Sequence, residues 1–398
     1  MDVSSGYPSG MRRPAVMFVV LLGAVSLFAD ITYEGARSIT GPFLAFLGAN
    51  AVIVGFVSGL GELIGYCVRL VSGYFADRTG RYWGITIFGY AVNMIAVPLL
   101  ALAGSWQIAA LLIIAERTGK GVRTPVRDVM LSHASSEIGR GWGFALHEAM
   151  DQVGAMLGPL IVAAILHFRG TYRTGFAVLL IPAILAICVL VTSALLYPRP
   201  RSLEAAAPPL RAEGLSEGYW LYVAAMALIA AGYADFPLIA FHFQRVASVP
   251  RDWIPIFYAV AMGVDAIAAL TFGRLFDRRG IIVVVISVVI SAFFAPLVLF
   301  GGFFMSLAGM VVWGIGMGAQ ESVMRAAVAE MVPADKRGTA YGIFNTGYGI
   351  FWFLGSALMG YLYDISLAWV VVFSMLSQFL SIPLLMLVRK NPKVLHAT

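Results

Sequence analysis

Residues 115–128 set the central problem of this chain, because they place six charges directly after an apolar segment. They read Ala-Glu-Arg-Thr-Gly-Lys-Gly-Val-Arg-Thr-Pro-Val-Arg-Asp, and no turn signal separates them from residues 108–114. At about 100° per residue, a continuous α-helix gathers most of these polar side chains into one stripe. The stripe consists of Arg117, Lys120, Arg123, Thr124, Arg127 and Asp128.

The composition around this stripe is that of a membrane protein. The 398 residues are 60% hydrophobic and 12% charged, whereas an ordinary soluble domain has about 25% charged residues. A charge facing lipid costs about 2.5–3.5 kcal/mol even on the lenient insertion scale. We therefore expect the stripe to face protein or a water-filled cavity, which indicates handling of a solute or of protons.

Apolar segments long enough to cross a hydrocarbon core of about 30 Å recur along nearly the whole chain. They predict an all-α polytopic membrane protein with twelve transmembrane helices. The expected spans are 14–48, 50–76, 83–103, 105–134, 140–168, 171–197, 218–247, 252–276, 281–302, 304–332, 337–363 and 366–388. A proline-containing polar segment after the sixth span predicts a six-helix bundle at 1–197, a cytoplasmic linker at 198–217 and a second six-helix bundle at 218–398.

The charges of the predicted loops indicate the orientation. Loops on the side of the N-terminus hold sixteen Lys and Arg residues, and the opposite loops hold four: Arg169, Arg173, Arg245 and Arg251. The positive-inside rule then places both termini in the cytoplasm and the chain in the cytoplasmic (inner) membrane. Because the net charge of +6 is spread over one membrane face, it requires no nucleic-acid partner.

The two halves of the sequence repeat each other. Residues 73–80 read Gly-Tyr-Phe-Ala-Asp-Arg-Thr-Gly, and residues 273–280 read Gly-Arg-Leu-Phe-Asp-Arg-Arg-Gly, at an offset of 200. A second repeat places Gly158 17 residues after Gly141, and Gly355 17 residues after Gly338. Matching loops in two sets of six spans predict two pseudo-symmetric bundles around a central cavity.

These motifs carry a resemblance to a known family. Gly73-x-x-x-Asp77-Arg78-x-Gly80-Arg81 resembles the signature loop of the major facilitator superfamily, and Arg117-x-x-x-Gly121 resembles the arginine motif of its fourth span. Phe75 and Tyr82 depart from the usual pattern of the loop. Residues 119–128, followed by His147-Glu148-Ala-Met-Asp151, resemble a prokaryotic subgroup for which no substrate is implied.

The fifth span carries a further, partial resemblance. Gly154-x-x-x-Gly158-Pro159 is similar to the antiporter motif of the family, although residues 160–162 replace its trailing small residues. The motif implies bending of this helix and gives a slight preference for export. The family as a whole implies a secondary transporter that works by alternating access and is not an enzyme.

Residues 73–81 and 273–280, which we call the gate loops, are expected to control the conformational change. Their functional residues are Gly73, Asp77, Arg78, Gly80 and Arg81 in the first loop and Gly273, Asp277, Arg278 and Gly280 in the second. The glycines would allow close helix approach and a tight turn, and Asp77 would accept hydrogen bonds from the neighbouring bundle. The alternative is a basic loop that only sets topology.

Several ionisable side chains share helix faces and form the predicted substrate-binding and proton-coupling set. Span one contributes Asp30, Tyr33, Glu34 and Arg37, and span five contributes His147 and Asp151. Span four contributes the charged stripe, and the C-terminal half adds Glu321 and Arg325. These charges suggest an aqueous pocket.

For the carboxylates Asp30, Glu34 and Asp151, the hypothesis is proton exchange. Burial favours the protonated form and a nearby arginine favours the ionised form, so a carboxylate whose partner moves can bind and release a proton. Arg117 is the expected partner. The alternative is a static network of ion pairs, and for His147 a neutral cavity histidine is favoured over a proton relay.

For the cations of the stripe, two interpretations stay open. Lys120, Arg123 and Arg127 either coordinate an anionic group of the solute or neutralise nearby carboxylates. The sequence predicts no cofactor and no metal site, since the helix at His147 lacks the second histidine of a zinc motif and Gly119-Lys120 lacks a phosphate-binding loop.

The function expected from the sequence is proton-coupled movement of a small polar or charged organic solute, with a slight preference for export. The expected partners are the solute, protons and the lipid bilayer, and the chain is expected to be a monomer. One alternative is a proton symporter that imports an organic anion or a siderophore-like solute. Another is a membrane sensor without net flux.

Asp77→Asn is expected to lower transport without preventing membrane insertion, because the substitution keeps the shape of the side chain and removes its charge. Flux through reconstituted protein, compared with the amount inserted, measures this effect. Unchanged flux would contradict a gating role.

Overall fold

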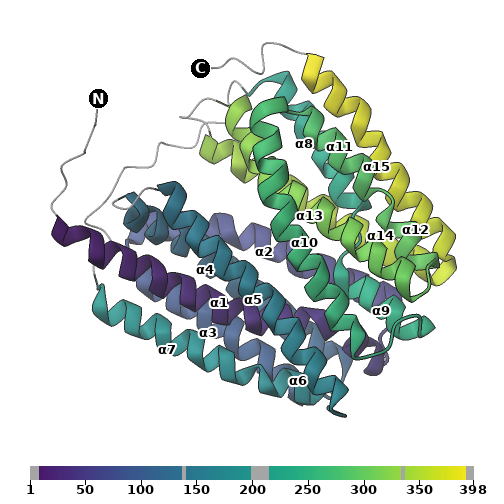
Figure 1. The fold of residues 1–398 in the computed structure, drawn as a ribbon, viewed down its shortest axis with the longest axis horizontal. Coiled ribbons are helices and arrows are strands. Elements are labelled where there is room, and N and C mark those ends of the chain that lie inside the picture. The colour runs from purple at the N-terminus through teal and green to yellow at the C-terminus, as the bar shows by residue number, and fades with distance from the viewer. Residues whose placement is uncertain (1–8, 137–139, 199–214, 333–336, 391–398) are drawn as a thin grey trace.

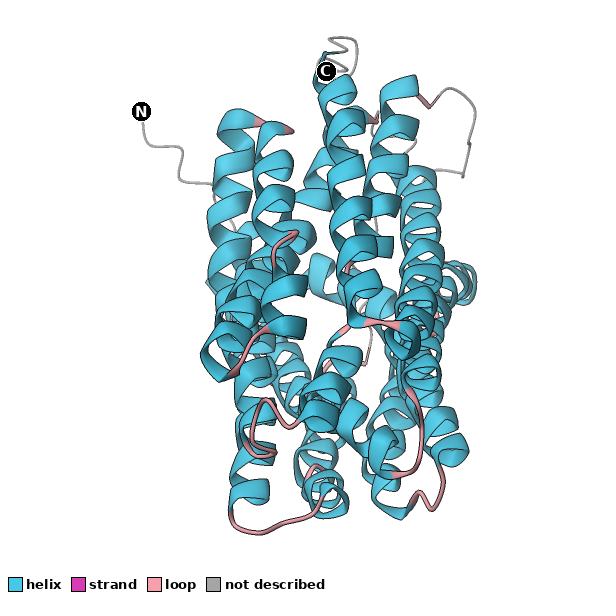
Figure 2. Cartoon of the chain, turned by 90° about the vertical axis from the view of Figure 1, so that its right-hand side faces the viewer, coloured by secondary structure: helices cyan, strands magenta, loops and turns pink. Residues whose placement is uncertain are grey.

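The computed structural model describes residues 9–136, 140–198, 215–332 and 337–390. Helices and short connections account for all of these residues, and no β-strand occurs among them (Figures 1 and 2). The helices are α1 (Ser9–Phe46), α2 (Ala51–Thr79), α3 (Tyr82–Leu99), η1 (Leu100–Leu102), α4 (Trp106–Ser136), α5 (Arg140–His167), α6 (Tyr172–Val178), α7 (Leu180–Leu196), α8 (Glu217–Gly232), α9 (Phe236–Val246), α10 (Trp253–Arg279), α11 (Ile282–Ser291), α12 (Phe294–Phe300), α13 (Phe303–Met331), α14 (Arg337–Ile365) and α15 (Leu367–Lys390).

The helices of the described residues group into twelve spans, which confirms the predicted fold class. Three spans are each made of two consecutive helices, namely α6 with α7, α8 with α9 and α11 with α12, while η1 continues α3. Ten spans are long and apolar enough to cross a membrane by length and composition. The other two are α4, which carries the charged stripe, and α14. The proposed linker at 198–217 falls largely outside the described residues, so the domain boundaries stay a prediction.

The span predicted at 218–247 as one helix is broken at residues 233–235. Asp235 caps the N-terminus of α9, where its side chain accepts a hydrogen bond from the backbone N–H of Phe236 at 2.9 Å. Pro237 occupies the first turn of α9, where the absence of a backbone N–H costs no helical hydrogen bond. The break therefore has a local cause, and it turns the Asp235 carboxylate toward α1.

The N-terminal half, α1–α7, and the C-terminal half, α8–α15, lie beside each other and diverge toward the end that carries both termini (Figure 1). They meet through α2 against α14, α5 against α10, and α9 against α1. At the end away from the termini, which we call the remote end, the contact is closest: a Cβ on Gly41 would collide with the carbonyl oxygen of Pro237, and a Cβ on Gly55 with that of Ser356. The halves are therefore closed at the remote end.

Glycines on α5 and α14 pack each of these helices against the first helix of its own half. A Cβ on Gly158 would collide with the carbonyl oxygen of Ile31 on α1, and a Cβ on Gly355 with that of Ala231 on α8. The spacing repeat that predicted related halves thus corresponds to equivalent helix contacts. Gly154 and Gly158 pack closely against α1, and α5 continues through both residues and Pro159, so the bending expected there stays a prediction.

Gly158→Ala should destabilise the protein by about 1–3 kcal/mol, because the added methyl group has no space beside α1. Thermal unfolding followed by tryptophan fluorescence in detergent measures the loss. Gly347→Ala is a matched control on α14, where the new Cβ would lie 3.7 Å from a side-chain carbon of Val223 in ordinary contact. Equal melting temperatures for the two variants would contradict the packing role of Gly158.

Candidate functional site

The charged stripe of α4 lies inside the protein, against α1, α2 and α3. Arg117 and Arg123 are buried, with 7% and 1% of their surface exposed, and Lys120 and Arg127 are largely covered. A buried charge is stable only beside opposite charges or hydrogen-bonding groups. The partners of each charge therefore define the chemistry of the interior.

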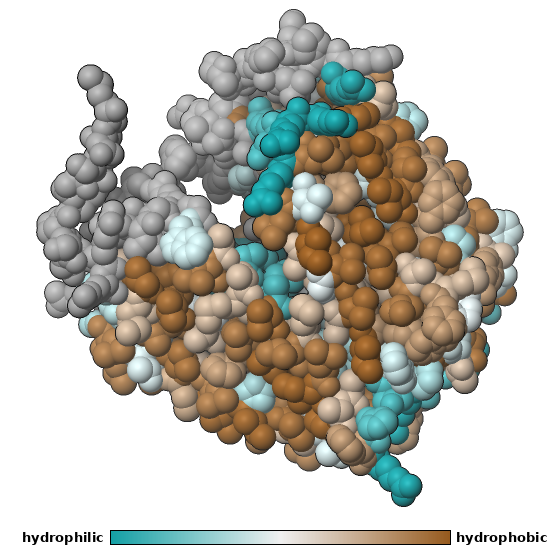
Figure 3. Space-filling model, in the orientation of Figure 1, coloured by the Kyte–Doolittle hydropathy of each residue, from teal (hydrophilic) through white to brown (hydrophobic). Residues whose placement is uncertain are grey.

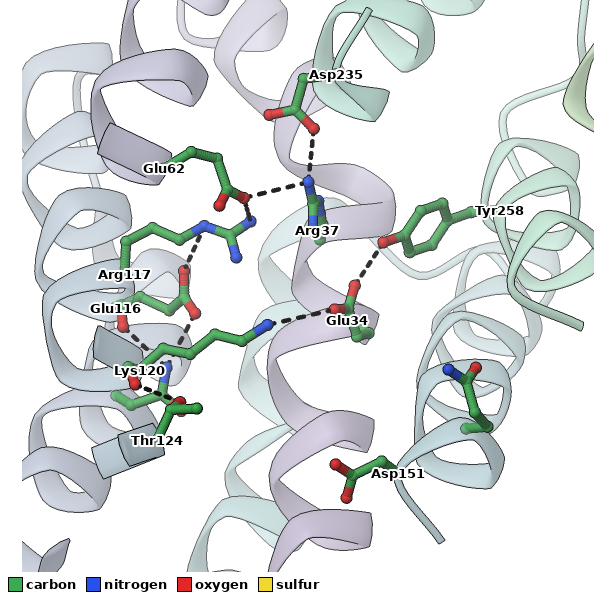
Figure 4. Close-up of polar contacts among 12 residues, drawn as sticks. Glu34, Arg37, Glu62, Glu116, Arg117, Lys120, Thr124, Asp151, Asp235 and Tyr258 are labelled. Atoms are coloured by element: carbon green, nitrogen blue, oxygen red, sulfur yellow. Dashed lines mark hydrogen bonds and ion pairs between the residues drawn. The ribbon is translucent and has the colours of Figure 1, made fainter. Parts of the chain in front are cut away.

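Toward the remote end, five side chains form a continuous chain of ion pairs, which we call the remote network. It consists of Asp235, Arg37, Glu62, Arg117 and Glu116 (Figure 4). The distance from Arg37 Nη2 to Asp235 Oδ1 is 2.6 Å, and the same nitrogen lies 3.3 Å from Glu62 Oε1. Asp235 belongs to the C-terminal half, so this network joins the two halves.

Arg117 pairs with Glu62 and Glu116, at 3.4 Å and 3.3 Å. The sequence had suggested Asp30, Glu34 or Asp151 as its partner, and in this conformation none of the three is within ion-pair distance of it. Lys120, one helical turn further along α4, is the cation that pairs with Glu34 instead. Glu116 accepts a further hydrogen bond, at 2.9 Å, from the side-chain amide of Asn93 on α3.

Glu34 on α1 contacts both halves of the protein. Its Oε1 lies 3.8 Å from Lys120 Nζ on α4, and its Oε2 accepts a hydrogen bond from the Tyr258 hydroxyl on α10 (Figure 4). The Lys120 ammonium also lies 3.9 Å from the ring centroid of Tyr33, within the range of a cation–π interaction. A relative movement of the halves would thus change the surroundings of this carboxylate.

Asp30 and Arg123 lie farther from the remote end than Glu34 and Lys120, by about one helical turn. Asp30 is buried on α1, and its strongest positively charged neighbours are Lys120 and Arg123. The guanidinium carbon of Arg123 lies 4.2 Å from the ring centroid of Tyr90 and 5.6 Å from that of Tyr33. Within the described residues, Nε and Nη1 of Arg123 have no hydrogen-bond partner. This arginine therefore has donors available inside the protein.

A third cluster lies toward the termini. Arg127 pairs with Asp128 at 2.8 Å and with Asp151 on α5 at 3.7 Å. Its Nη1 donates a hydrogen bond to Ser26 Oγ at 2.9 Å, and that hydroxyl also lies 2.9 Å from His147 Nε2. His147 Nδ1 is 3.5 Å from Asp151. The predicted set from spans one, four and five is therefore brought together, in layers along α1.

The roles of the two C-terminal members of the predicted set, Glu321 and Arg325, stay predictions. Glu321 lies on α13 with an exposed side chain. The side chain of Arg325 lies outside the described part of the structure. The charged interior is thus built mainly by the N-terminal half, with Asp235 and Tyr258 contributed by the C-terminal half.

The gate loops lie at the end of the termini, and each contains a glycine that caps the preceding helix, with ψ angles of 14° at Gly80 and −145° at Gly280. Gly80 and Gly280 have φ angles of 62° and 59°, which favour glycine, and their backbone N–H groups donate to Ala76 and Phe276. The close helix approach expected at Gly73 is absent, because a Cβ there would lie 3.7 Å from Pro125 Cβ; Gly273 has similar space.

The charged residues of the gate loops are only partly described. Arg78 donates a hydrogen bond to the Tyr74 hydroxyl at 3.1 Å, and Arg81, Asp277 and Arg278 are exposed. The side chain of Asp77 lies outside the description, so its predicted contact with the other half stays a prediction.

The space-filling view shows a hollow between the halves on the face of Figure 3, with hydrophilic atoms inside it. Deeper in the protein, a pocket lies beside the remote network. It is lined by Tyr33, Arg37, Glu116, Arg117 and Asp235 together with small polar and apolar side chains. With about 20 Å³ of free space, this pocket can hold a water molecule and not an organic solute in this conformation.

The predicted set lacks six residues of this site: the carboxylates Glu62, Glu116 and Asp235, and the polar residues Tyr258, Asn93 and Ser26. Tyr258 lies seven residues before Asp265 and therefore on the same face of α10, a spacing that marks a polar face. Asn93 is an amide inside an otherwise apolar span. Ser26 gave no signal, because a serine on a long helix commonly bonds to its own backbone.

Twelve helical spans that close at one end, diverge at the other and enclose paired charges define a membrane transporter. Comparison with known proteins supports this class. The sequence model described as "Major Facilitator Superfamily" matches residues 20–300 and 236–397. The chain belongs to the Major Facilitator Superfamily of secondary transporters.

Individual relatives and solved structures agree with this assignment. The chain is 41% identical over 390 residues to an uncharacterized protein of Mycobacterium tuberculosis, covering 96% of this chain and 95% of that protein. It is 24% identical over 364 residues to an uncharacterized MFS-type transporter of Methanocaldococcus jannaschii, covering 87% and 89%. The structure of the nucleoside transporter NupG superposes with a TM-score of 0.78 at 13% identity, covering 94% of this chain and 100% of that one, and it shows the same fold.

Asp235→Asn should weaken the closure of the remote end, because it removes one partner of a buried ion pair at a cost of about 3–5 kcal/mol. Spin labels at Phe168→Cys and Val246→Cys, with both native cysteines replaced by serine, would report the distance between the halves at that end. We expect a longer distance to become populated. Asp364→Asn is the matched control, since Asp364 pairs with Arg245 within the C-terminal half; an unchanged distance in Asp235→Asn would contradict the role of the pair.

Proposed function

We propose that this chain is a proton-coupled secondary transporter that exports a small polar or charged organic solute by alternating access. The two halves would rock about the charged interior, so that the solute site opens to one side of the membrane at a time. The domain division at residues 198–217 and the role of the gate loops belong to this proposal. The loop charges support both termini and the open hollow lying on the cytoplasmic side of the inner membrane.

The observation that carries the proposal is the position of Glu34 between the halves. In the closed remote end it is stabilised by Lys120 from its own half and by Tyr258 from the other half. Opening of the remote end would remove the Tyr258 donor and admit water. Because burial favours the protonated carboxylate while nearby cations and donors favour the ionised one, proton binding at Glu34 would depend on the conformation.

Asp151 and Asp30 are the other two carboxylates proposed to exchange protons, and both lie closer to the termini than Glu34. Asp151 is shared between Arg127 and His147, and its Oδ1 has no hydrogen-bond partner within the described residues. A Cβ on Gly154 would lie 2.9 Å from Asp30 Cβ, so α5 packs directly on the segment of α1 that carries Asp30. A shift of α5 against α1 would therefore alter the surroundings of both carboxylates.

The solute is proposed to contact the cations of α4. Lys120 and Arg127 already have carboxylate partners, whereas the unpartnered Nε and Nη1 of Arg123 are donors for a polar or anionic group. The partial antiporter motif at residues 154–159 supports export over import. A proton symporter would use the same residues, and its direction of flux would distinguish it.

The test is proton-linked flux in proteoliposomes with a pH-sensitive dye inside. Solutes are first selected by their thermal stabilisation of the purified protein. Glu34→Gln should reduce proton movement driven by a solute gradient about tenfold or more, equivalent to about 1.4 kcal/mol, while solute exchange continues. Asp30→Asn and Asp151→Asn test the other candidates, and Asp364→Asn is the control.

Full proton-driven transport in all three carboxylate variants would refute the coupling. Solute flux in the direction of the proton gradient would favour the importing symporter. Binding of solutes without any flux in the wild-type protein would favour a sensor instead.

A further inference from the structure

The pocket beside the remote network is lined by three residues that each carry a buried polar atom without a hydrogen-bond partner. These atoms are Nε of Arg37, Oγ of Ser58 and Oδ2 of Asp235, and the statement holds within the described residues. Arg37 and Ser58 belong to α1 and α2 in the N-terminal half, whereas Asp235 directly precedes α9 in the C-terminal half. Leaving a buried polar group unpaired costs free energy, so three such groups around one cavity indicate a shared partner.

Two of these atoms lie beside the direct ion pair between the halves. Arg37 Nη2 is 2.6 Å from Asp235 Oδ1, and the two side chains point toward each other (Figure 4). Arginine and carboxylate groups frequently pair through two parallel hydrogen bonds. Here the second nitrogen, Nε, and the second oxygen, Oδ2, are held next to the first contact by their covalent bonds and are not bonded to each other. A small molecule between these two atoms would complete the second bridge of the pair.

The volume of the pocket is suited to a single water molecule. Its free space is about 20 Å³, whereas a buried water needs roughly 10–15 Å³ of such space and two to four polar partners. A second pocket, in the C-terminal half, has about 10 Å³, and its polar side chains already have hydrogen-bond partners: Tyr222, Ser287, Ser291 and Gln320. The pocket beside the remote network therefore combines sufficient space with unpartnered groups, and the second pocket does not.

The chemistry of the lining favours a neutral molecule that both donates and accepts. Arg37 Nε can only donate, the Asp235 carboxylate oxygen accepts, and the Ser58 hydroxyl can do either. Both signs of charge line the pocket, since Arg117 and Glu116 are also part of it. A cation would be repelled by the two arginines and an anion by the two carboxylates. Water can accept from Arg37, donate to Asp235 and form a third hydrogen bond with Ser58.

We propose that one water molecule is built into the closed remote end, where it is bound by Arg37, Ser58 and Asp235. It forms a second bridge between the halves, next to the direct ion pair. Because this bridge requires Asp235 to lie against α1, opening of the remote end would release the water to solvent. The site follows from the closed structure and does not depend on the proposed transport function.

The direct test is a structure of the purified full-length protein with its remote end closed, at a resolution that shows ordered water. A density peak is expected at hydrogen-bond distance, about 2.7–3.2 Å, from Arg37 Nε, Ser58 Oγ and Asp235 Oδ2. No peak at this position, in a map that shows other ordered waters, would overturn the proposal. An anomalous signal there in crystals grown with bromide would identify an anion site and would overturn it as well.

Two variants of Ser58 test its part in the site. Ser58→Ala removes one of three partners and should lower the occupancy of the peak, and Ser58→Val should displace the water by placing methyl groups in the pocket. Thr40→Val is the matched control, because Thr40 also lines the pocket but its hydroxyl already donates to the carbonyl oxygen of Ala36 at 2.9 Å. The peak should persist in Thr40→Val. Unchanged occupancy in Ser58→Ala would overturn the proposed binding, even if Ser58→Val fails to fold.

The bridging role is measured separately by the distance across the remote end, with spin labels at Phe168→Cys and Val246→Cys. Ser58→Ala removes a hydrogen bond that the closed end makes and creates no steric conflict. It should therefore raise the ratio of open to closed protein about fivefold relative to Thr40→Val. Equal ratios in the two variants would show that the water does not hold the halves together and would overturn the bridge.

Discussion

The cost of removing an ion from water determines how the interior of this protein is arranged. A charge within the spans persists only where an opposite charge or a hydrogen-bonding group compensates it. Arg37 is shared by Asp235 and Glu62, and Arg117 by Glu62 and Glu116. Because these residues come from α1, α2, α4 and the break before α9, the ion pairs fix the mutual positions of four segments.

Much of the fold could be predicted, because its determinants are local in the sequence. Apolar length marks the spans, and the repeated gate loops relate the halves. The break at residues 233–235 was missed because apolar composition continues across it. Its signal was the short sequence Asp235-Phe236-Pro237, in which a capping side chain is followed by a proline suited to the first turn of a helix.

The sequence predicted which helix faces carry the polar residues of the site, but it did not predict which of these residues pair with one another. Helical periodicity placed Asp30, Glu34 and Arg37 on one inward face, because that property depends on α1 alone. Which cation meets which carboxylate depends on the relative heights of packed helices, and Lys120 rather than Arg117 reaches Glu34. Tyr258 comes from the other half, 224 residues away, and the sequence around Glu34 carries no information about it.

The two contacts of α1 with the C-terminal half explain how the closed remote end can open although its ion pairs are buried. Arg37 and Glu34 lie three residues apart, so one movement of the halves would separate Arg37 from Asp235 and Glu34 from Tyr258. Each retains a partner in its own half, Glu62 for Arg37 and Lys120 for Glu34. Neither charge is left unpaired, which lowers the cost of opening relative to breaking an isolated buried pair. Asp235 keeps its hydrogen bond to the backbone N–H of Phe236, so the cap of α9 survives the same movement.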